Sequence, residues 1–255
     1  MDRLTPKQLE LRQREDSILA TASPMIRAGG LAAISMDAIA KKMRYTRGTI
    51  YNHFPNKEDI VLSLAARAVR RRVELFHFAA SLADASRQRV AAIGIACEVY
   101  ADQLPDDFAV EHMIRHDSIW QKTSTRRRDV LCDCESQCMS VVGRIVGQAI
   151  DDKDFRLPRG RGIPDVVLGL WSLVYGSQVL ETTSPSFTDM GITDSHQAIR
   201  RNCNAMLDGL GWTPLYDPSR YNRFVKRILP LLSEKAKQLK SDRSDSTSRS
   251  PEAGT

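Results

Sequence analysis

The stretch Ser35–Phe54, SMDAIAKKMRYTRGTIYNHF, decides the fold that we expect for this chain. Apolar residues recur in its first half at helical spacing, which predicts a short helix with one buried stripe. Ser35 stands where the N-cap of that helix belongs. The segment Arg44-Tyr45-Thr46 that follows is too short for anything except a tight turn between two helices. The predicted buried stripe consists of Met36, Ile39, Ala40 and Met43.

A second short helix is predicted over residues 47–53, with Ile50 and Phe54 buried and a polar face turned outward. A helix of this length gains little from intrinsic propensity, so its neighbours must hold it in place. Outward donors and acceptors on such a helix are typical of the recognition helix of a helix-turn-helix, which meets base edges and phosphates. The polar face comprises Arg47, Thr49, Tyr51, Asn52 and His53.

Further motifs flank this stretch in the order and spacing of one known family. They are Ile18-Leu19-Ala20-Thr21-Ala22, Gly29-Gly30, Ser35-Met36, Ile39-Ala40, Gly48-Thr49-Ile50-Tyr51, His53-Phe54 and Asn56-Lys57-Glu58-Asp59. On these residues, the region from about residue 12 to residue 72 resembles the N-terminal domain of TetR-family transcriptional regulators. Two positions depart from the family pattern. Pro24 falls inside the predicted first helix, which it should kink, and Arg44 replaces the small residue that the family favours in the turn.

The resemblance implies an all-α protein, in which a three-helix DNA-binding domain precedes a helical domain for ligand binding and dimerisation. We expect a charged N-terminal arm over residues 1–11, the DNA-binding domain over 12–72 with its helix-turn-helix motif at 35–54, the helical domain over 73–240 and a disordered tail over 241–255. Within these regions the apolar pattern predicts helices near residues 9–28, 73–83, 87–103, 106–121, 126–151, 164–183, 195–209 and 218–240, and a fourth helix that begins after Asn56 and reaches Arg72. The tail consists mostly of small and polar residues and cannot bury enough surface to order itself.

Charge is distributed unevenly along the chain. Residues 1–72 contain 14 Lys and Arg against 7 Asp and Glu, whereas the rest of the chain contains 23 against 24. The excess positive charge therefore lies in the proposed DNA-binding domain, where it would release counterions from DNA and supply non-specific affinity. A basic surface that is merely solvated would not explain so uneven a division.

The resemblance also assigns roles on the DNA. We expect Arg47 and Asn52 to read base edges, and Gly48 to let the backbone approach the DNA closely because it has no Cβ. Phosphate contacts set register rather than sequence, and Lys57 is well placed for one because it lies at the start of a helix. Thr49, Tyr51, His53 and Lys57 are the predicted phosphate contacts, and Ser35, Arg44 and Thr46 complete the predicted DNA-binding set.

The resemblance further implies a homodimer that binds an inverted-repeat operator in double-stranded DNA. Family members pair two C-terminal helices with those of a second subunit, and the segments 164–183 and 195–209 fit that role. A helix that is apolar over most of its circumference must be covered on several sides, although a core helix of a single subunit would satisfy the same pattern. The residues predicted for the dimer interface are Gly169, Ser172, Leu173, Gly176 and Leu180.

A small-molecule pocket is expected in the helical domain, again by resemblance. An apolar pocket with a few polar groups would suit a lipophilic or aromatic effector. Each candidate residue could equally belong to the ordinary hydrophobic core. The candidates are Cys97, Tyr100, Phe108, His112, Met113, His116, Trp120, Trp171 and Tyr175.

Two smaller clusters leave alternatives open. His112 and His116 have the spacing that lets two imidazoles share a metal, but no third ligand is evident, so we predict no metal site and no cofactor. Cys134 and Cys138 share a helix face from which Cys132 points away. This triplet is interpreted as a thiol sensor, a soft-metal site or simply core residues.

The remaining features favour a cytoplasmic regulator. No secretion signal is visible, the longest apolar run, Val166–Leu180, is short for a membrane span, and an odd number of cysteines fits reduced thiols. We therefore expect a ligand-responsive transcriptional repressor. The alternatives are an activator of the same type, a thiol-sensing or metal-sensing regulator, a sequence-indifferent architectural DNA binder and, more remotely, a helical-bundle enzyme, for which no nucleophile–base set or phosphate loop is seen.

Overall fold

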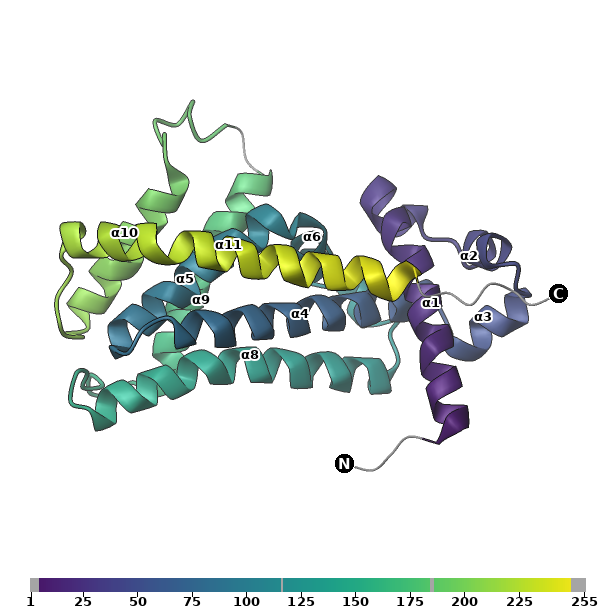
Figure 1. The fold of residues 1–255 in the computed structure, drawn as a ribbon, viewed down its shortest axis with the longest axis horizontal. Coiled ribbons are helices and arrows are strands. Elements are labelled where there is room, and N and C mark those ends of the chain that lie inside the picture. The colour runs from purple at the N-terminus through teal and green to yellow at the C-terminus, as the bar shows by residue number, and fades with distance from the viewer. Residues whose placement is uncertain (1–4, 116, 184–185, 249–255) are drawn as a thin grey trace. The chain divides into compact units, whose positions relative to one another are not determined.

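The computed structural model describes residues 5–115, 117–183 and 186–248, and all of its regular elements are helices (Figure 1). This confirms the predicted all-α fold class. In chain order the elements are α1 (Pro6–Gly29), the short 3₁₀-helix η1 (Gly30–Ala33), α2 (Met36–Met43), α3 (Arg47–His53), α4 (Lys57–Ser81), α5 (Ser86–Gln103), α6 (Pro105–Met113), α7 (Asp117–Trp120), α8 (Thr125–Asp151), α9 (Ile163–Thr183), α10 (Ser195–Gly209) and α11 (Pro218–Ser248).

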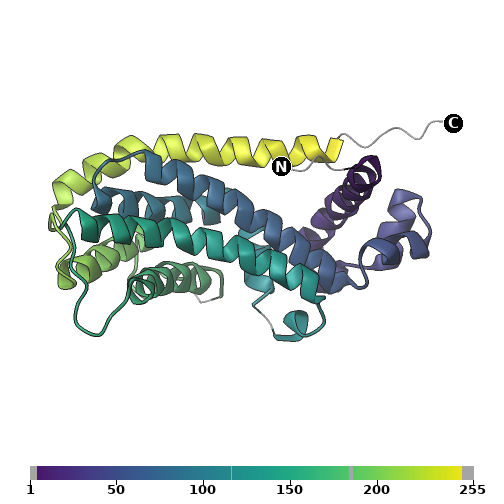
Figure 2. The ribbon, with the colours of Figure 1, turned by 90° about the horizontal axis from the view of Figure 1, so that it is seen from below.

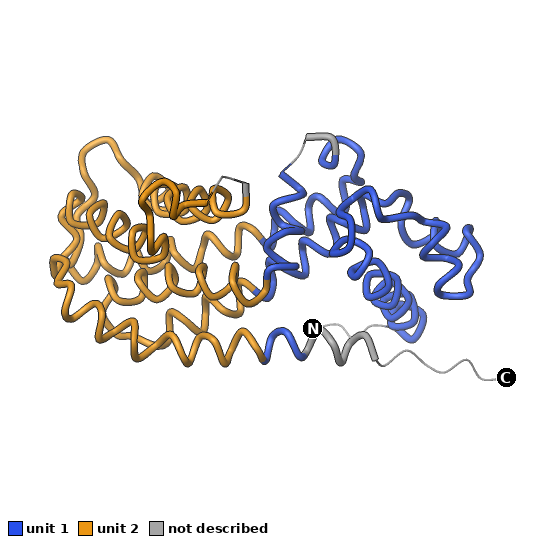
Figure 3. Tube along the Cα trace, turned by 90° about the horizontal axis from the view of Figure 1, so that it is seen from above, with its two compact units in different colours: residues 1–71, 105–134, 238–255 blue, residues 72–104, 135–237 orange. Residues whose placement is uncertain are grey.

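The helices form two compact units (Figure 3). The first unit combines residues 1–71 with residues 105–134 and 238–255. The second combines residues 72–104 with residues 135–237. The predicted division into consecutive domains at residues 12–72 and 73–240 stays a prediction.

In the first unit, α1, α2 and α3 pack on one another, and they lie together in both Figure 1 and Figure 2. Their shared core contains Ile18, Leu19, Ile39, Ile50 and Phe54, all of which are fully buried or nearly so. Removing side chains of this size from water is the main stabilising contribution to so small a helical cluster.

Helix α1 begins earlier than predicted because of a capping signal near the N-terminus. The hydroxyl of Thr5 accepts the backbone N–H of Gln8, and the side chain of Gln8 accepts the backbone N–H of Thr5 in return. Pro6 occupies the first helical position, where its missing N–H costs nothing. The helix continues through Pro24 and ends at Gly29, and the next residue, Gly30, has a positive φ of 62°, which glycine adopts without strain.

Three other helix boundaries differ from the prediction. Helix α4 is continuous to Ser81, because no breaker separates the helix predicted up to Arg72 from the one predicted at 73–83. The single helix predicted at 106–121 is divided into α6 and α7, with Ile114 turned into the core at 4% exposure. Helix α11 reaches Ser248 instead of ending at residue 240, since an established helix extends at little cost through polar residues. The remainder of the predicted disordered tail, residues 249–255, lies outside the described residues.

The second unit is built around α5, α9 and α10, which pack on one another. Trp212 is fully buried and stacks on Phe155 with ring centroids 4.9 Å apart. The buried guanidinium of Arg87 forms an ion pair with Asp208 at 2.6 Å and donates to the side-chain oxygen of Asn204. These contacts join α5 to α10, which is the framework that supports α9.

Candidate nucleic-acid interface

The predicted helix-turn-helix is present over Ser35–Phe54, and both of its helices are capped by side chains. The hydroxyl of Ser35 accepts the backbone N–H of Ala38 at 3.3 Å, which confirms the predicted N-cap of α2. At the start of α3, the hydroxyl of Thr46 accepts the backbone N–H of Thr49 at 3.1 Å. Between the helices, Arg44 adopts a left-handed conformation with φ of 56°. The turn therefore closes on a non-glycine residue in a conformation that glycine prefers.

Helix α3 is anchored from its inner side. Ile50 and Phe54 are both fully buried, as predicted. The guanidinium of Arg127, from α8, lies 4.7 Å from the centroid of the Phe54 ring and forms an ion pair with Glu15 of α1 at 2.7 Å. Because the side chain of Arg127 is only 13% exposed, this cation is largely withdrawn from water. Arg127 therefore ties the end of α3 to α1, a role that the sequence pattern did not indicate.

The outer face of α3 carries polar groups that the chain itself leaves uncovered. The side chains of Arg47, Tyr51 and Asn52 are exposed. Arg47 forms an ion pair with Asp37 of α2, but both side chains are more than half exposed. An ion pair so exposed contributes at most about 1 kcal/mol. Breaking this ion pair to free the Arg47 guanidinium for another partner would therefore cost little.

The space around Gly48 is open as far as the structure describes the chain. A Cβ atom built at this position would meet only the hydroxyl of Thr46, at an ordinary contact distance of 3.8 Å. The residue is the second of α3, and glycine is less favourable than alanine in a helix. No described part of the chain requires the absence of a side chain here.

The start of α4 is buried or half-buried over residues 56–59. Asn56 caps it as predicted, because its side-chain oxygen accepts the N–H of Asp59 at 2.8 Å. Asp59 is 1% exposed and accepts the N–H of Ser124 at 2.7 Å, while the side-chain amide of Asn56 donates to the carbonyl of Lys122 at 2.9 Å. Residues 56–59 thus hold the segment that leads into α8. The half-buried Lys57 donates to the carbonyl of Leu31 at 3.3 Å.

His53, at the end of α3, is half-buried, and its Nδ1 atom meets no hydrogen-bond partner among the residues that are described. Burial lowers the pKa of His53, and although Glu15 opposes this change, the nearby Arg14 and Arg127 reinforce it. The imidazole is therefore mainly neutral at neutral pH. As a neutral ring, His53 is less suited to hold a phosphate than the exposed cations Arg44 and Arg47.

The second unit exposes an apolar face on α9. Leu168 and Leu180 are 55% and 52% exposed, and Ser172 between them is also exposed. A Cβ built at Gly176 would meet no atom within 4 Å. These four residues recur every fourth position and share one face of the helix. Leu168 was not among the predicted interface residues, although its spacing from Ser172 would have indicated it.

Gly169 and Leu173, two other predicted interface residues, lie differently. A Cβ at Gly169 would collide with the side chain of Met206 on α10, so this glycine permits close packing between α9 and α10 within one chain. Leu173 is half-buried.

Helix α9 is also long and apolar enough to cross a membrane. The segment Ile163–Thr182 has a mean hydropathy of 1.3, and 22% of it is buried. An apolar helix that a second protein subunit covers has the same composition.

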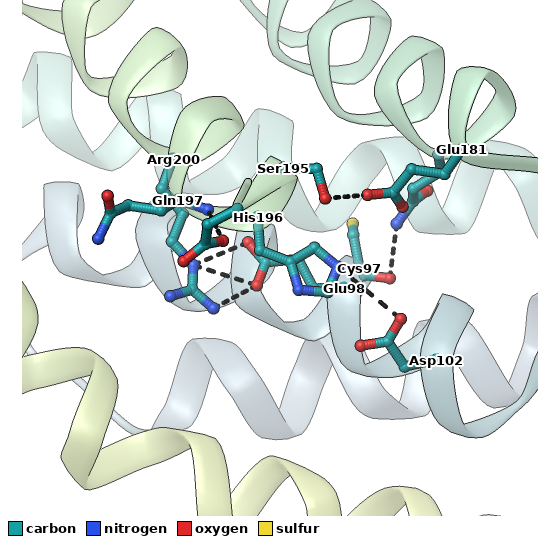
Figure 4. A network of polar contacts seen from close by, with 10 residues as sticks. Cys97, Glu98, Asp102, Glu181, Ser195, His196, Gln197 and Arg200 are labelled. Carbon is teal, nitrogen blue, oxygen red and sulfur yellow. Dashed lines mark hydrogen bonds and ion pairs between the residues drawn. The ribbon is translucent and has the colours of Figure 1, made fainter. Parts of the chain in front are cut away.

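Polar contacts fix α9 and α10 against α5 (Figure 4). Arg200 of α10 forms an ion pair with Glu98 of α5, and the side-chain amide of Gln178 on α9 donates to the carbonyl of Cys97 at 2.7 Å. Burial raises the pKa of Glu98, and the hydrogen bond from Arg200 opposes that rise. A third link joins Ser195 of α10 to Glu181 of α9. The inner side of α9 is therefore held firmly, while the face marked by Leu168 and Leu180 is left open.

The residues predicted to line a ligand pocket fall in both units. Cys97, Tyr100, Trp171 and Tyr175 belong to the second unit, and Phe108, His112, Met113 and Trp120 belong to the first. The rings of Trp171 and Tyr175 are neighbours, with centroids 6.0 Å apart. Tyr100 and Phe108 are buried, as ordinary core residues also are. His116 lies outside the described residues, so the pocket stays a prediction.

The cysteine triplet divides as its spacing predicted. Cys134 and Cys138 are buried, whereas Cys132 is exposed. All five cysteines are free thiols. Burial raises the pKa of Cys203 to about 12 and, with a larger effect, that of Cys97, so neither thiol is activated as a nucleophile at neutral pH. Within the described ranges, no group of three or more His, Cys, Asp or Glu residues is arranged to hold a metal ion.

A capped helix-turn-helix with a buried anchor and a polar outer face defines a helix-turn-helix DNA-binding protein. Residues 18–64 match the family described as bacterial regulatory proteins, tetR family. The N-terminal part of the chain is thus similar to this family, and the resemblance noted there in the sequence is confirmed.

Known relatives are similar to about a third of the chain. The transcriptional regulator EthR of Mycolicibacterium smegmatis is 38% identical over 82 residues, which is 32% of this chain and 38% of EthR. EthR of Mycobacterium tuberculosis is 39% identical over 83 residues, with the same shares covered. The chain thus matches less than half the length of these relatives, which are transcriptional regulators.

Solved structures extend the likeness to most of the fold. A transcriptional regulator from Pseudomonas aeruginosa has a TM-score of 0.60 at 16% identity, with 87% of this chain and 96% of that one covered. The regulator FadR from Bacillus subtilis, solved in complex with stearoyl-CoA, has a TM-score of 0.52 at 16% identity, with 78% and 98% covered. At these identities the likeness shows the fold alone.

Proposed function

We propose that the protein is a ligand-responsive transcriptional repressor, which binds an inverted-repeat operator as a homodimer and leaves it when a small molecule binds. The outward face of α3 carries this proposal. It exposes Arg47, Tyr51 and Asn52 to solvent, while Ile50 and Phe54 fix the helix from behind. A rigid helix with free donors and acceptors is the arrangement that enters a major groove.

Gly48 supports close contact with DNA. Glycine is unfavourable in a helix, and none of the residues that the structure describes excludes a side chain at this position. A DNA backbone or base edge pressed against the start of α3 would exclude one. Arg47 and Asn52 lie beside Gly48, so the same approach would bring their side chains to base edges, where each good bidentate contact contributes about 1–3 kcal/mol of discrimination.

The open face of α9 supports the dimer. Ser172 and Gly176 are small and lie between the exposed Leu168 and Leu180, so a helix from a second subunit could approach closely and cover both leucines. Burial of this surface would also remove the apolar patch from water. A symmetric pair would place two α3 helices in successive major grooves, about 34–36 Å apart. A protein that regulates transcription in this way works in the cytoplasm.

The effector that we propose is apolar or aromatic. The fold of the chain is similar to that of FadR, whose structure contains stearoyl-CoA. The predicted pocket residues of the second unit, among them Tyr100, Trp171 and Tyr175, would give a largely apolar lining with a few polar groups. Binding would favour a dimer in which the two α3 helices no longer match the groove spacing, which requires the effector to prefer that conformation.

Selection of bound duplexes from a random pool tests the operator proposal. We expect the selected sequences to share a two-fold repeat, and footprints to be confined to that site with a much weaker background. Apolar compounds are then screened for those that release the protein from the purified protein–operator complex. A reporter gene under control of the operator distinguishes repression from activation. A protein that protects all duplexes alike would be an architectural binder, and the proposal would be abandoned.

Substitution of single residues tests the assigned roles. Arg47→Ala should relax base preference at one operator position and weaken specific binding by about 1–3 kcal/mol. Lys57→Ala should weaken binding to all sequences alike and reduce the slope of log K against log salt by about one unit. Arg144→Ala, which removes an exposed arginine of α8, is the control and should change neither quantity. Identical behaviour of the Arg47 and Lys57 variants would contradict the assignment.

A further inference from the structure

The first unit contains a cleft with an unusual number of arginines. It lies between α1, α4 and α8 and has a volume of about 470 Å³. The five arginines that line it are Arg12, Arg67, Arg70, Arg126 and Arg127. Only two acidic residues, Glu15 and Asp16, line it as well, so its side chains carry an excess of positive charge.

Both acids of the cleft are already engaged. Glu15 forms an ion pair with Arg127 at 2.7 Å, and Asp16 forms one with Arg67. The other three arginines, Arg12, Arg70 and Arg126, are exposed, and none has an acidic partner among the described residues. The cleft thus has three guanidinium groups beyond those that its own carboxylates neutralise.

Two of the arginines are drawn into the cleft wall. The side chains of Arg67 and Arg127 are 26% and 13% exposed. Burial lowers the pKa of Arg67, Asp16 opposes this change, and the neighbouring Arg71 and Arg70 reinforce it. Glu15 and Asp16 offset the charge of these two arginines. The charge that is left without a carboxylate is that of the three exposed arginines lining the same cleft, and this surplus points to an anionic occupant.

The shape and remaining lining limit what that occupant can be. Leu11, Leu19 and Val130 add an apolar surface beside the arginines. A duplex meets protruding side chains, but it is too wide to enter a cleft of this volume and reach Arg67 and Arg127 in its wall. A single carboxylate would neutralise only one of three surplus charges, whereas a phosphate monoester carries close to two and matches the forked donors of arginine.

We propose that the cleft between α1, α4 and α8 binds a small phosphate-bearing molecule. The phosphate is held by Arg70 and Arg126 at the mouth and by Arg67 in the wall, and an apolar or planar group of the ligand lies against Leu11 and Val130. The site is separate from the predicted effector pocket and from the outer face of α3. It does not depend on the proposed DNA-binding function, because binding can be measured without DNA.

Calorimetric titration of the full-length protein tests the site, with orthophosphate, pyrophosphate and adenosine 5′-monophosphate as probes and adenosine as the uncharged match. We expect saturable binding of pyrophosphate and of the monophosphate, and none of adenosine. The double variant Arg70→Ala/Arg126→Ala should bind at least tenfold more weakly. Circular dichroism confirms its fold, which should persist because both side chains are exposed. The double variant Arg144→Ala/Arg201→Ala removes two exposed arginines outside the cleft and should bind as the wild type does.

Three results would overturn the proposal. The first is that none of the phosphate probes binds. The second is that the phosphate probes bind equally well to both double variants, or that titration with sodium chloride at matched ionic strength gives the same binding signal. Either result would indicate general charge screening. The third is that the cleft variant loses affinity only for duplex DNA of any sequence, which would make these arginines part of the DNA-binding surface.

Discussion

Helices α3 and α9 each leave one face uncovered by the rest of the chain, but the two faces differ in chemistry. The face of α3 is polar, with Arg47 and Asn52 exposed beside a glycine. The face of α9 is apolar, with Leu168 and Leu180 more than half exposed on either side of two small residues. Polar groups that are already hydrated suit a contact that forms and dissolves, whereas exposed leucines favour a contact that is kept. The comparison therefore supports the two proposals, that α3 contacts DNA and that α9 contacts a second copy of the chain.

The largest effect is expected when the α9 face is made charged. In the double variant Leu168→Glu/Leu180→Glu the two carboxylates would have to be buried in the proposed interface, which is strongly unfavourable. Light scattering after size exclusion should show a single subunit. Operator affinity should fall by about 10²–10⁴-fold, because the α3 helices of the two subunits would no longer be linked.

An equally exposed leucine elsewhere provides the control for this result. Leu215 is 63% exposed and lies outside α9, so Leu215→Glu should leave both the assembly and the operator affinity unchanged. If the α9 double variant remained a dimer, the assignment of the two faces would be wrong and the subunits would have to pair elsewhere.

A smaller effect is expected when the inner support of α3 is removed. Arg127→Ala takes away the cation on the Phe54 ring and leaves Glu15, whose side chain is 16% exposed, without its partner. The free energy of unfolding by urea should fall by about 1.5–3 kcal/mol, the range for a lost hydrogen bond to a charged group. Operator binding should weaken because α3 is less firmly held, while dimer assembly stays intact.

A double-mutant cycle sharpens this prediction. If Glu15 and Arg127 act as a pair, Glu15→Gln combined with Arg127→Ala should destabilise the protein by less than the sum of the two single effects. Arg144→Ala, on the same helix as Arg127 but fully outside this cluster, should have almost no effect. Strict additivity of the Glu15 and Arg127 variants would show that the pair contributes nothing to the support of α3.

The smallest effect concerns the pH dependence of folding stability that His53 contributes. Burial lowers the pKa of His53 in the folded chain below the value of about 6.5 in the unfolded chain. Below pH 6.5 the unfolded state therefore binds more protons at this site than the folded state, so stability is lost as pH falls through the folded pKa. The fall in melting temperature between pH 7.5 and pH 5.5 should be smaller in His53→Gln than in the wild type. An unchanged pH dependence would exclude His53 as its source.

The parts of this fold that the sequence predicted are those with local signals. The caps at Ser35 and Asn56, the stop at Gly30 and the buried pair Ile50 and Phe54 each depend on neighbours within a few residues. Such signals are readable because capping and helical periodicity are properties of short segments. The helix-turn-helix, which decides the class of the protein, is made almost wholly of them.

The features that were missed depend on distant partners. Arg127 supports α3 through Glu15, which is 112 positions away in the sequence, and Asp59 binds the N–H of Ser124, 65 positions away. The predicted interface glycine Gly169 proved to pack on Met206 within the chain, while Gly176 on the same helix is open. No periodicity distinguishes these two glycines, since only the position of α10 decides which of them is covered.

Arg44 has two opposite effects: its left-handed backbone conformation is strained, and its side chain adds positive charge. An arginine in this conformation is strained by about 1 kcal/mol relative to glycine, yet it carries a positive charge at the turn of the helix-turn-helix. Heat tolerance and attraction for DNA therefore oppose each other at a single residue. A lineage of this protein adapting to higher temperature would gain by losing the arginine only where its operator tolerated weaker electrostatic attraction.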